Sequence, residues 1–295
     1  MRGKIQLSFF CLLAASLFAS PLFACHKVTQ KCPKPPQAQP KKPFDVYVET
    51  FFKNQPDFAK YGAKDGRTHL GMIYEGSMFA KGSDRKLLPS KSKTLGAIQD
   101  RYKNFAGLFA IDIESWPLYG SDAQTAANVQ KFLTVLGWIK TAIPNATVGY
   151  YGVVPINGYS ATQVSETHPR HQLWRERNDR IVALGKAVEA TFPSLYPVDS
   201  NSKGWVRYAV GNIKEARRLS PGKKVYPFIN PRYHSRAKDS SGKDISFDRV
   251  PYDFFLLQLE TLKQHADGVV IWDGSRREWN ANEPWWLATR KFLGK

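Results

Sequence analysis

Short apolar runs rich in β-branched and aromatic residues alternate with longer segments of helical periodicity along most of this chain. Such alternation is the pattern of a β/α repeat built around a parallel sheet. Seven runs are candidate strands: residues 45–50, 69–74, 107–113, 146–152, 193–198, 223–229 and 268–272. They predict an α/β fold: either a closed (β/α) barrel of the triosephosphate-isomerase type or a distorted relative of it with seven strands.

Three segments between these runs carry apolar residues at three- and four-residue spacing and are expected to be helices. They are residues 122–142, 173–191 and 204–219. An open, doubly wound sheet is the alternative to a closed barrel. No Gly-x-Gly-x-x-Gly turn or Walker loop follows any candidate strand, which argues against the nucleotide-binding version of that alternative.

The first 44 residues read as an export signal followed by a linker. Residues 1–24 combine two early basic residues, an apolar stretch and small residues, as a signal peptide does. The sequence LFAC at 22–25 resembles a bacterial lipobox, so Cys25 is a candidate for lipid attachment, with ordinary signal cleavage as the alternative. Residues 25–44 are rich in proline and lysine and predict an extended linker ahead of a barrel domain at 45–295. We therefore expect a secreted, periplasmic or lipid-anchored protein that meets a membrane only through its signal or lipid.

The chain is strongly basic, with a net charge of +18. The first 44 residues hold seven of the basic side chains and no acidic one, so residues 45–295 keep a net charge of +11. Such a balance attracts polyanions, among them nucleic acid, anionic lipid and acidic polysaccharide. No nucleic-acid-binding motif is present, so no specific nucleic-acid partner is expected.

The sharpest local feature is AIDIESWP at 110–117, at the end of the third predicted strand. Because strand side chains alternate between faces, Asp112 and Glu114 project the same way, one rung apart. Two close carboxylates repel each other, and partial burial adds to this, so one of them should hold its proton near neutral pH. A protonated carboxyl is what a general acid requires. The alternative is a structural acid pair bound to a lysine or a helix N-terminus.

Aromatic and polar residues stand at the ends of several of the other predicted strands: Tyr150, Tyr151, Tyr196, Phe228 to Arg232, and Trp272. In a barrel the C-terminal ends of the strands meet at one rim. Aromatic faces stack on pyranose rings, while polar tips bond to hydroxyl groups. This placement predicts a sugar site. His168 and His171 lack a carboxylate or cysteine that would complete a ligand set, so no metal is expected.

The AIDIESWP segment resembles the V-I-D-[FW]-E-x-W-R-P segment of glycoside hydrolase family 56, the hyaluronidases. Further similar motifs follow in the same order: GYYG at 149–152, RND at 177–179, FPSLY at 192–196, WVR at 205–207, IKEA at 213–216, VYPF at 225–228 and GVVIW at 268–272. The resemblance runs from about residue 95 to 275. Together with the lipobox-like sequence, it points to a divergent bacterial member of that family.

The resemblance implies a distorted seven-stranded barrel and a retaining endo-β-N-acetylhexosaminidase. Glu114 would be the acid/base, and Asp112 with Tyr196 would orient the substrate's acetamido group. The carbonyl oxygen of that group would be the nucleophile, as in other substrate-assisted enzymes. The other candidates for substrate contact are Tyr151, Trp272, Trp116 and Arg232.

The implied substrate is an acidic or N-acetylated polysaccharide such as hyaluronan or chondroitin, with no cofactor. The chain departs from the family pattern in lacking its disulfide cysteines, in Pro117 where an arginine follows the tryptophan, and in His234 where an aspartate is often found. These departures leave the choice of polymer open. The alternative function is a cell-surface barrel that binds polysaccharide without cleaving it.

Overall fold

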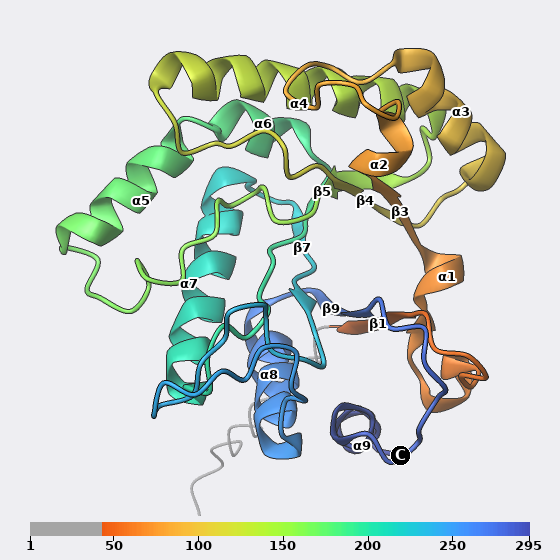
Figure 1. The fold of residues 1–295 in the computed structure, drawn as a ribbon, viewed down its shortest axis with the longest axis vertical. Helices are drawn as coiled ribbons and strands as arrows, with labels where there is room; N and C mark the ends of the chain where they lie inside the picture. Colours follow the sequence, from red (N-terminus) through yellow and green to blue (C-terminus); the bar gives the residue numbers. More distant parts are fainter. Residues whose placement is uncertain (1–42) are drawn as a thin grey trace, which may run out of the picture. The chain divides into compact units, whose positions relative to one another are not determined.

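Parallel strands surrounded by helices make up the part of the chain that the structure, a computed structural model, describes, residues 43–295 (Figure 1). The predicted signal at 1–24, the linker up to residue 42 and Cys25 lie outside the described residues. Within the described range, no helix is long and apolar enough to cross a membrane.

The strands form a barrel wall in three pieces, which pair as β3-β4-β5, β6-β7 and β2-β1-β9-β8. Parallel bridges Tyr151–Phe192 and Ser194–Phe228 join the pieces. No ladder joins β1 to β3 among the described residues, and short β2 pairs with β1 there instead. The bounds are β1 (Asp45–Thr50), β2 (Lys64–Asp65), β3 (Leu70–Tyr74), β4 (Leu108–Asp112), β5 (Thr147–Tyr150), β6 (Ala190–Thr191), β7 (Lys224–Val225), β8 (Phe228–Ile229) and β9 (Gly268–Asp273).

Six of the seven predicted strands lie where the sequence pattern places them, with β7 and β8 together occupying the sixth. The prediction of a strand at 193–198 is wrong, because the fifth strand is β6, which ends at Thr191. Pro193 and Pro197 carry no N–H to donate to a ladder, so only isolated bridges follow β6.

Helices cover the outside of the strands. In Figure 1, α3 and α4 lie beside β3, β4 and β5, whereas α7 and α8 lie on the side of β7 and β9. The helices are η1 (Phe58–Tyr61), α1 (Gly66–His69), α2 (Glu75–Met78), α3 (Lys91–Tyr102), α4 (Asp122–Ala142), α5 (Pro169–Asp179), α6 (Val182–Ala187), α7 (Ser202–Leu219), α8 (Tyr252–His265) and α9 (Pro284–Phe292).

The helix predicted at 122–142 is confirmed by α4, and the one at 204–219 by α7. Ser121 caps α4 by accepting a hydrogen bond from the Gln124 N–H at 3.3 Å, as an N-cap serine does. The single helix predicted at 173–191 is instead two helices, α5 and α6, followed by β6. Apolar residues at helical spacing occur in both helices, so the helical periodicity of the sequence did not reveal the break between α5 and α6.

Strand alternation divides the apolar side chains into an inner and an outer set. Phe109 and Ile111 of β4 face the helices, whereas Leu108 and Ala110 face the barrel interior. Side chains fill that interior: Tyr47, Leu70, Met72, Leu108, Ala110, Ala190, Phe192, Tyr226, Phe228 and Val270. Four partly buried aromatic residues pack against this cluster: Tyr74, Tyr151, Tyr196 and Trp272. The filled interior thus supports an aromatic layer beside the strands' C-terminal ends.

Candidate active site

Asp112 and Glu114 lie at and just beyond the C-terminal end of β4. Asp112 continues the row of Leu108 and Ala110, which face the interior, and Glu114 is the next residue on that row. Asp112 is half-buried and Glu114 is exposed, lining a cavity of about 310 Å³. The structure therefore places the two predicted carboxyls on one face at the mouth of the barrel.

The Asp112 carboxyl has a strongly raised pKa of about 7. Burial is the largest cause, and the nearby carboxylates of Glu114 and Glu75 add to it. One of its oxygens, Oδ1, is buried without a hydrogen-bond partner among the described residues. Near neutral pH the Asp112 carboxyl is therefore present in both its protonated and its ionised state.

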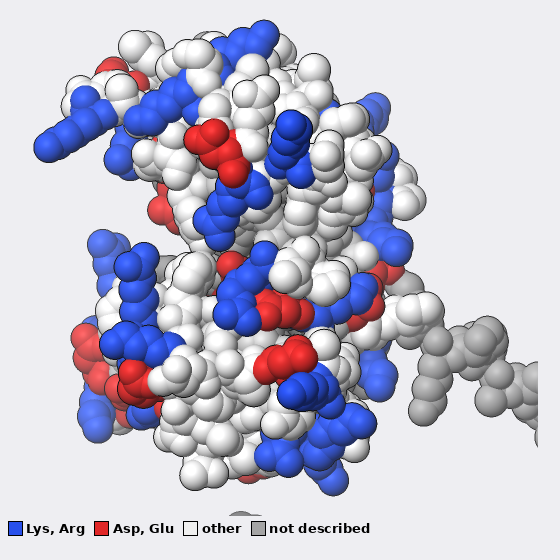
Figure 2. Space-filling model, turned by 90° about the vertical axis from the view of Figure 1, so that its right-hand side faces the viewer, with Lys and Arg blue, Asp and Glu red and all other residues white. Residues whose placement is uncertain are grey.

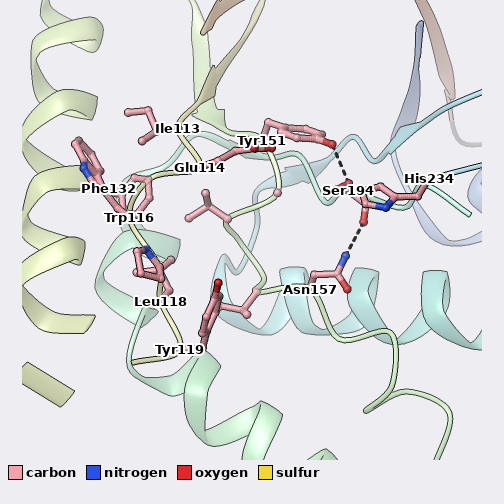
Figure 3. A pocket seen from close by; sticks show the side chains of 14 residues that line it. Ile113, Glu114, Trp116, Leu118, Tyr119, Phe132, Tyr151, Asn157, Ser194 and His234 are labelled. Atoms are coloured by element: carbon pink, nitrogen blue, oxygen red, sulfur yellow. Dashed lines mark hydrogen bonds between the residues drawn. The ribbon is translucent and has the colours of Figure 1, made fainter. Parts of the chain in front are cut away.

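The aromatic residues predicted at the rim lie together. The rings of Tyr196 and Trp272 stack with centroids 6.3 Å apart and planes 15° apart. The Tyr151 ring is 6.0 Å from that of Tyr196, and its hydroxyl bonds to Ser194 Oγ at 2.9 Å (Figure 3). The Trp272 indole N–H donates to the Tyr74 hydroxyl at 3.2 Å. These contacts fix the rings relative to one another before any sugar binds.

The phenols of this layer are neutral hydrogen-bonding groups. Burial raises the pKa of Tyr74 and that of Tyr151 to about 12, and it raises the pKa of Tyr196 well above its ordinary value. The charge of Asp112 acts on all three phenols in the same direction. Because they stay protonated at physiological pH, each of them can donate a hydrogen bond to a sugar or to a carboxylate.

Two cavities meet at this layer. The first contains Glu114, Tyr151 and Ser194 and is shown in Figure 3. The second, of about 430 Å³, is lined by Tyr196, Trp272 and Arg232 among others. His234 lines both cavities, so they are neighbours across its side chain. The predicted residues Tyr151, Tyr196, Trp272 and Arg232 are therefore brought into one region with the acid pair.

The chain matches no protein-family model and no curated protein sequence. Among solved structures, bee venom hyaluronidase superposes with a TM-score of 0.61 at 19% identity, over 85% of this chain and 97% of the bee chain. Bee venom hyaluronidase in complex with a hyaluronic acid tetramer gives a TM-score of 0.58 at 18% identity, over 85% and 95%. The fold is hyaluronidase-like. The match spans nearly the whole of the bee chain and most of this one. It confirms the predicted fold class, a distorted (β/α) barrel.

Within this hyaluronidase-like barrel, Trp116 lies deeper than predicted for a residue that contacts substrate. It is 3% exposed, and its ring packs edge-on against Phe132 with centroids 5.0 Å apart. Its indole N–H donates to the Arg85 carbonyl at 2.8 Å. Trp116 borders the Glu114 cavity, but its protein contacts favour a role in supporting the Glu114 segment over stacking on a sugar.

Glu75 is a site residue that the sequence analysis missed. Its Oε2 accepts hydrogen bonds from the backbone N–H of Glu114 at 3.1 Å and of Ser115 at 3.2 Å, and from the Ser115 hydroxyl at 2.9 Å. Its Oε1 accepts from Arg85 at 2.6 Å. Burial alone would raise the pKa of Glu75, but these hydrogen bonds outweigh it and hold the pKa below its ordinary value. Glu75 thus anchors the backbone that carries Glu114.

His168 and His171 both make contacts that stabilise the structure around α5. The His168 ring accepts a hydrogen bond from the Arg170 N–H at 3.1 Å and so caps α5, while the His171 ring packs edge-on against Trp174 at 5.4 Å. In residues 43–295, no group of three or more His, Cys, Asp or Glu side chains is arranged to hold a metal ion.

Among the charged side chains on the face shown in Figure 2, Lys and Arg cover more of the surface than Asp and Glu. The acid pair and Glu75 form an acidic cluster at the barrel mouth, with Arg85 paired to Glu75 and Arg232 lining the neighbouring cavity.

Proposed function

We propose that this protein is a glycoside hydrolase, an endo-β-N-acetylhexosaminidase that cleaves within an amino-sugar polysaccharide. One observation carries the proposal: Asp112 and Glu114 share one face at the barrel mouth, beside the stacked rings of Tyr196 and Trp272. A carboxyl pair supplies proton transfer, and stacked aromatic rings are suited to holding pyranose rings. The hyaluronidase-like fold supports the same reaction class.

In the proposed reaction, Glu114 donates a proton to the glycosidic oxygen as its bond to the anomeric carbon breaks. The acetamido carbonyl oxygen of the same sugar attacks the anomeric carbon from the opposite face and forms a cyclic oxazolinium ion. The Asp112 carboxylate accepts the acetamido N–H, and the neutral Tyr196 phenol donates a hydrogen bond to that group. Water then gives a proton to Glu114 and opens the ring, which restores the original configuration at the anomeric carbon.

The proposed substrate is an acidic or N-acetylated polysaccharide. The net charge of +11 on residues 45–295 supports an acidic polymer, and the hyaluronic acid tetramer bound to bee venom hyaluronidase supports a polysaccharide ligand. We further propose that the protein works outside the cytoplasm, released or anchored by lipid at Cys25, because residues 1–25 combine a signal-like segment with a lipobox-like end.

Reducing-end release from hyaluronan, chondroitin and peptidoglycan glycans tests this proposal. The full-length protein should cleave at least one of the three polymers. The Glu114→Gln variant should lose at least about a hundredfold in rate, since general acid catalysis contributes about that much or more. Glu176→Gln, at an exposed position on α5, is the matched control and should keep the rate.

Two results would contradict the proposal. Equal cleavage by Glu114→Gln and Glu176→Gln would remove Glu114 from the chemistry. Binding of a polymer without cleavage by any form of the protein would favour the alternative, a cell-surface barrel that only binds polysaccharide.

A further inference from the structure

A third cavity, of about 380 Å³, opens beside the aromatic layer on the side of β1 and β3. Glu49 of β1 lines it together with the aromatic side chains of Tyr74, Tyr102 and Trp272 and the guanidinium groups of Arg101 and Arg276. We call this cavity the Glu49 pocket. Trp272 also lines the cavity beside Tyr196, so the Glu49 pocket adjoins the candidate active site across one indole ring.

Glu49 is a buried carboxyl without a full set of partners. Its side chain lies on the interior face of β1 and is 3% exposed, yet Oε2 has no hydrogen-bond partner in the described part of the chain. Burial and the nearby Asp65 raise its pKa to about 7, against the opposing charges of Arg101 and Arg67. An enclosed carboxyl oxygen without a donor disfavours the charged form, and a ligand would reach the Glu49 carboxyl from the side that lines the pocket.

Gly66 leaves the space that the Glu49 carboxyl occupies. A Cβ atom placed on Gly66, the first residue of α1, would lie 2.3 Å from Glu49 Oε2, far inside contact distance. Only glycine at position 66 therefore allows the observed position of the Glu49 carboxyl. The conformation is held by close packing against α1.

The walls of the Glu49 pocket are fixed as well. The Tyr102 hydroxyl accepts a hydrogen bond from the Met72 N–H at 3.1 Å and donates one to the Met72 carbonyl at 2.9 Å, which ties α3 to β3. Elsewhere in the lining, the Trp272 indole N–H donates to the Tyr74 hydroxyl. Flat, anchored aromatic walls of this kind suit the apolar faces of a pyranose.

Arg101 and Arg276 are exposed, and neither forms an ion pair with a residue of the described range. A guanidinium group only donates hydrogen bonds, so these two side chains offer donors to an acceptor group on a ligand. Glu49 offers the opposite chemistry, an acceptor, from a buried position. The Glu49 pocket thus presents acceptor and donor groups on different parts of its lining.

We propose that the Glu49 pocket is a further sugar-binding subsite and that Glu49 determines its specificity. One sugar residue of the polymer would donate ring hydroxyls to the Glu49 carboxyl and present an acceptor group to Arg101 and Arg276. Both the acetamido carbonyl of an N-acetylhexosamine and the carboxylate of a uronic acid have that acceptor chemistry. The inference rests on the proposed function, because the sugar in the pocket neighbours the one at the acid pair.

Calorimetric titration of the full-length Glu114→Gln protein tests the subsite, with an N-acetylglucosamine tetramer and a hyaluronan tetramer as probes. Adding Glu49→Gln should weaken binding of at least one tetramer by about tenfold or more, since a hydrogen bond to a charged acceptor is lost. Adding Gly66→Ala, which keeps the charge but displaces the Glu49 carboxyl together with the β1 backbone at Glu49 Cα, 2.8 Å from the added Cβ, should have a similar effect. Glu176→Gln and Gly96→Ala are the matched controls, because Gly96 lies on α3 with no atom within 4 Å of an added Cβ.

Arg101→Ala then distinguishes the two sugars. A larger loss with the hyaluronan tetramer assigns a uronic acid to the Glu49 pocket, and a larger loss with the N-acetylglucosamine tetramer assigns an N-acetylhexosamine. Unchanged binding of both tetramers by Glu49→Gln and Gly66→Ala, relative to their controls, would overturn the subsite. An absence of tetramer binding in every form of the protein would also overturn the proposed subsite.

The polymer-cleavage assay separates this inference from the proposed function. Cleavage that depends on Glu114, with no effect of Glu49→Gln on binding, would leave the hydrolase and remove the subsite. Binding that depends on Glu49, with no cleavage, would leave the subsite and remove the hydrolase.

Discussion

Replacing Glu75 with glutamine should loosen the segment that carries Glu114. The Glu75 side chain is 17% exposed, and its carboxylate accepts from the backbone N–H groups of Glu114 and Ser115, from the Ser115 hydroxyl and from Arg85. Glutamine keeps the size of the side chain but removes the charge. It also replaces one of the two carboxylate oxygens with an N–H₂ group, which cannot accept the hydrogen bonds that this oxygen accepts from its donors.

The expected cost follows from the hydrogen bonds that depend on the charge. Exchanging a charged acceptor for a neutral one weakens each bond by about 1 kcal/mol, and three donors from Glu114 and Ser115 are affected. The ion pair with Arg85 adds less than about 1 kcal/mol, because the Arg85 side chain is 52% exposed. We expect the free energy of unfolding to fall by about 2 to 3 kcal/mol.

Urea denaturation at pH 7 measures this change, with Arg85→Gln as the control that removes only the ion pair. Because the pKa of Glu75 is lowered in the folded protein, its stabilisation is present above the unfolded pKa of about 4 and is lost as pH falls below it. The difference between wild type and Glu75→Gln should therefore narrow at pH 3. On a polymer that the wild type cleaves, kcat should fall about tenfold to a hundredfold while KM changes little.

A loss of stability in Glu75→Gln no larger than that in Arg85→Gln would contradict this prediction. A kcat of Glu75→Gln equal to that of the wild type would contradict it as well, since the Glu114 backbone would then need no anchor.

Two further changes test the raised pKa of Asp112 and the close packing of the barrel. Because the Asp112 pKa is raised to about 7, its contribution to stability is complete below about pH 4 and is lost as pH rises to 7. Asp112→Asn should therefore unfold less readily than wild type at pH 8, by up to about 3 kcal/mol in urea denaturation, and the advantage should disappear at pH 4. Gly149→Ala should lower the stability by more than about 2 kcal/mol in thermal melts, because its Cβ would lie 2.1 Å from the Ala190 carbonyl oxygen. Gly137→Ala is the control, because Gly137 lies on α4 and an added Cβ would meet no atom within 4 Å. This variant should be as stable as the wild type, or more stable by up to about 1 kcal/mol.

The fold was predictable because strand and helix periods alternate in the sequence, and long segments such as α4 and β9 carry them clearly. β6 was misplaced for a physical reason. It has only two residues in regular pairing, and it follows α6 without a polar turn that would mark the change of period. The next stretch, 193–198, has strand-like composition but is interrupted by prolines, so it pairs only through isolated bridges.

The candidate site was predictable where polar or aromatic residues stood at or just beyond the C-terminal end of a strand. Asp112, Tyr196 and Trp272 follow this pattern, and the structure brings them together. Glu49 and Glu75 stand at the ends of β1 and β3, so the same rule applied to those strands would have found them. Their partners could not be predicted, because the Gly66 backbone and the Glu114 N–H come close only in the folded barrel.

Two carboxyls with raised pKa values face the barrel interior from different strands, Glu49 from β1 and Asp112 from β4. Burial is the largest cause in both, so both gain negative charge over the same range near pH 7. The basic surface outside the mouth does not lose its charge in that range, since lysine and arginine titrate far above it. Attraction of an acidic polymer to the barrel should therefore persist at pH 8, while the charge that it meets inside the mouth becomes more negative. Under the proposed function, the basic surface would attract acidic polymers alike, and the groups at the mouth would discriminate among their sugars.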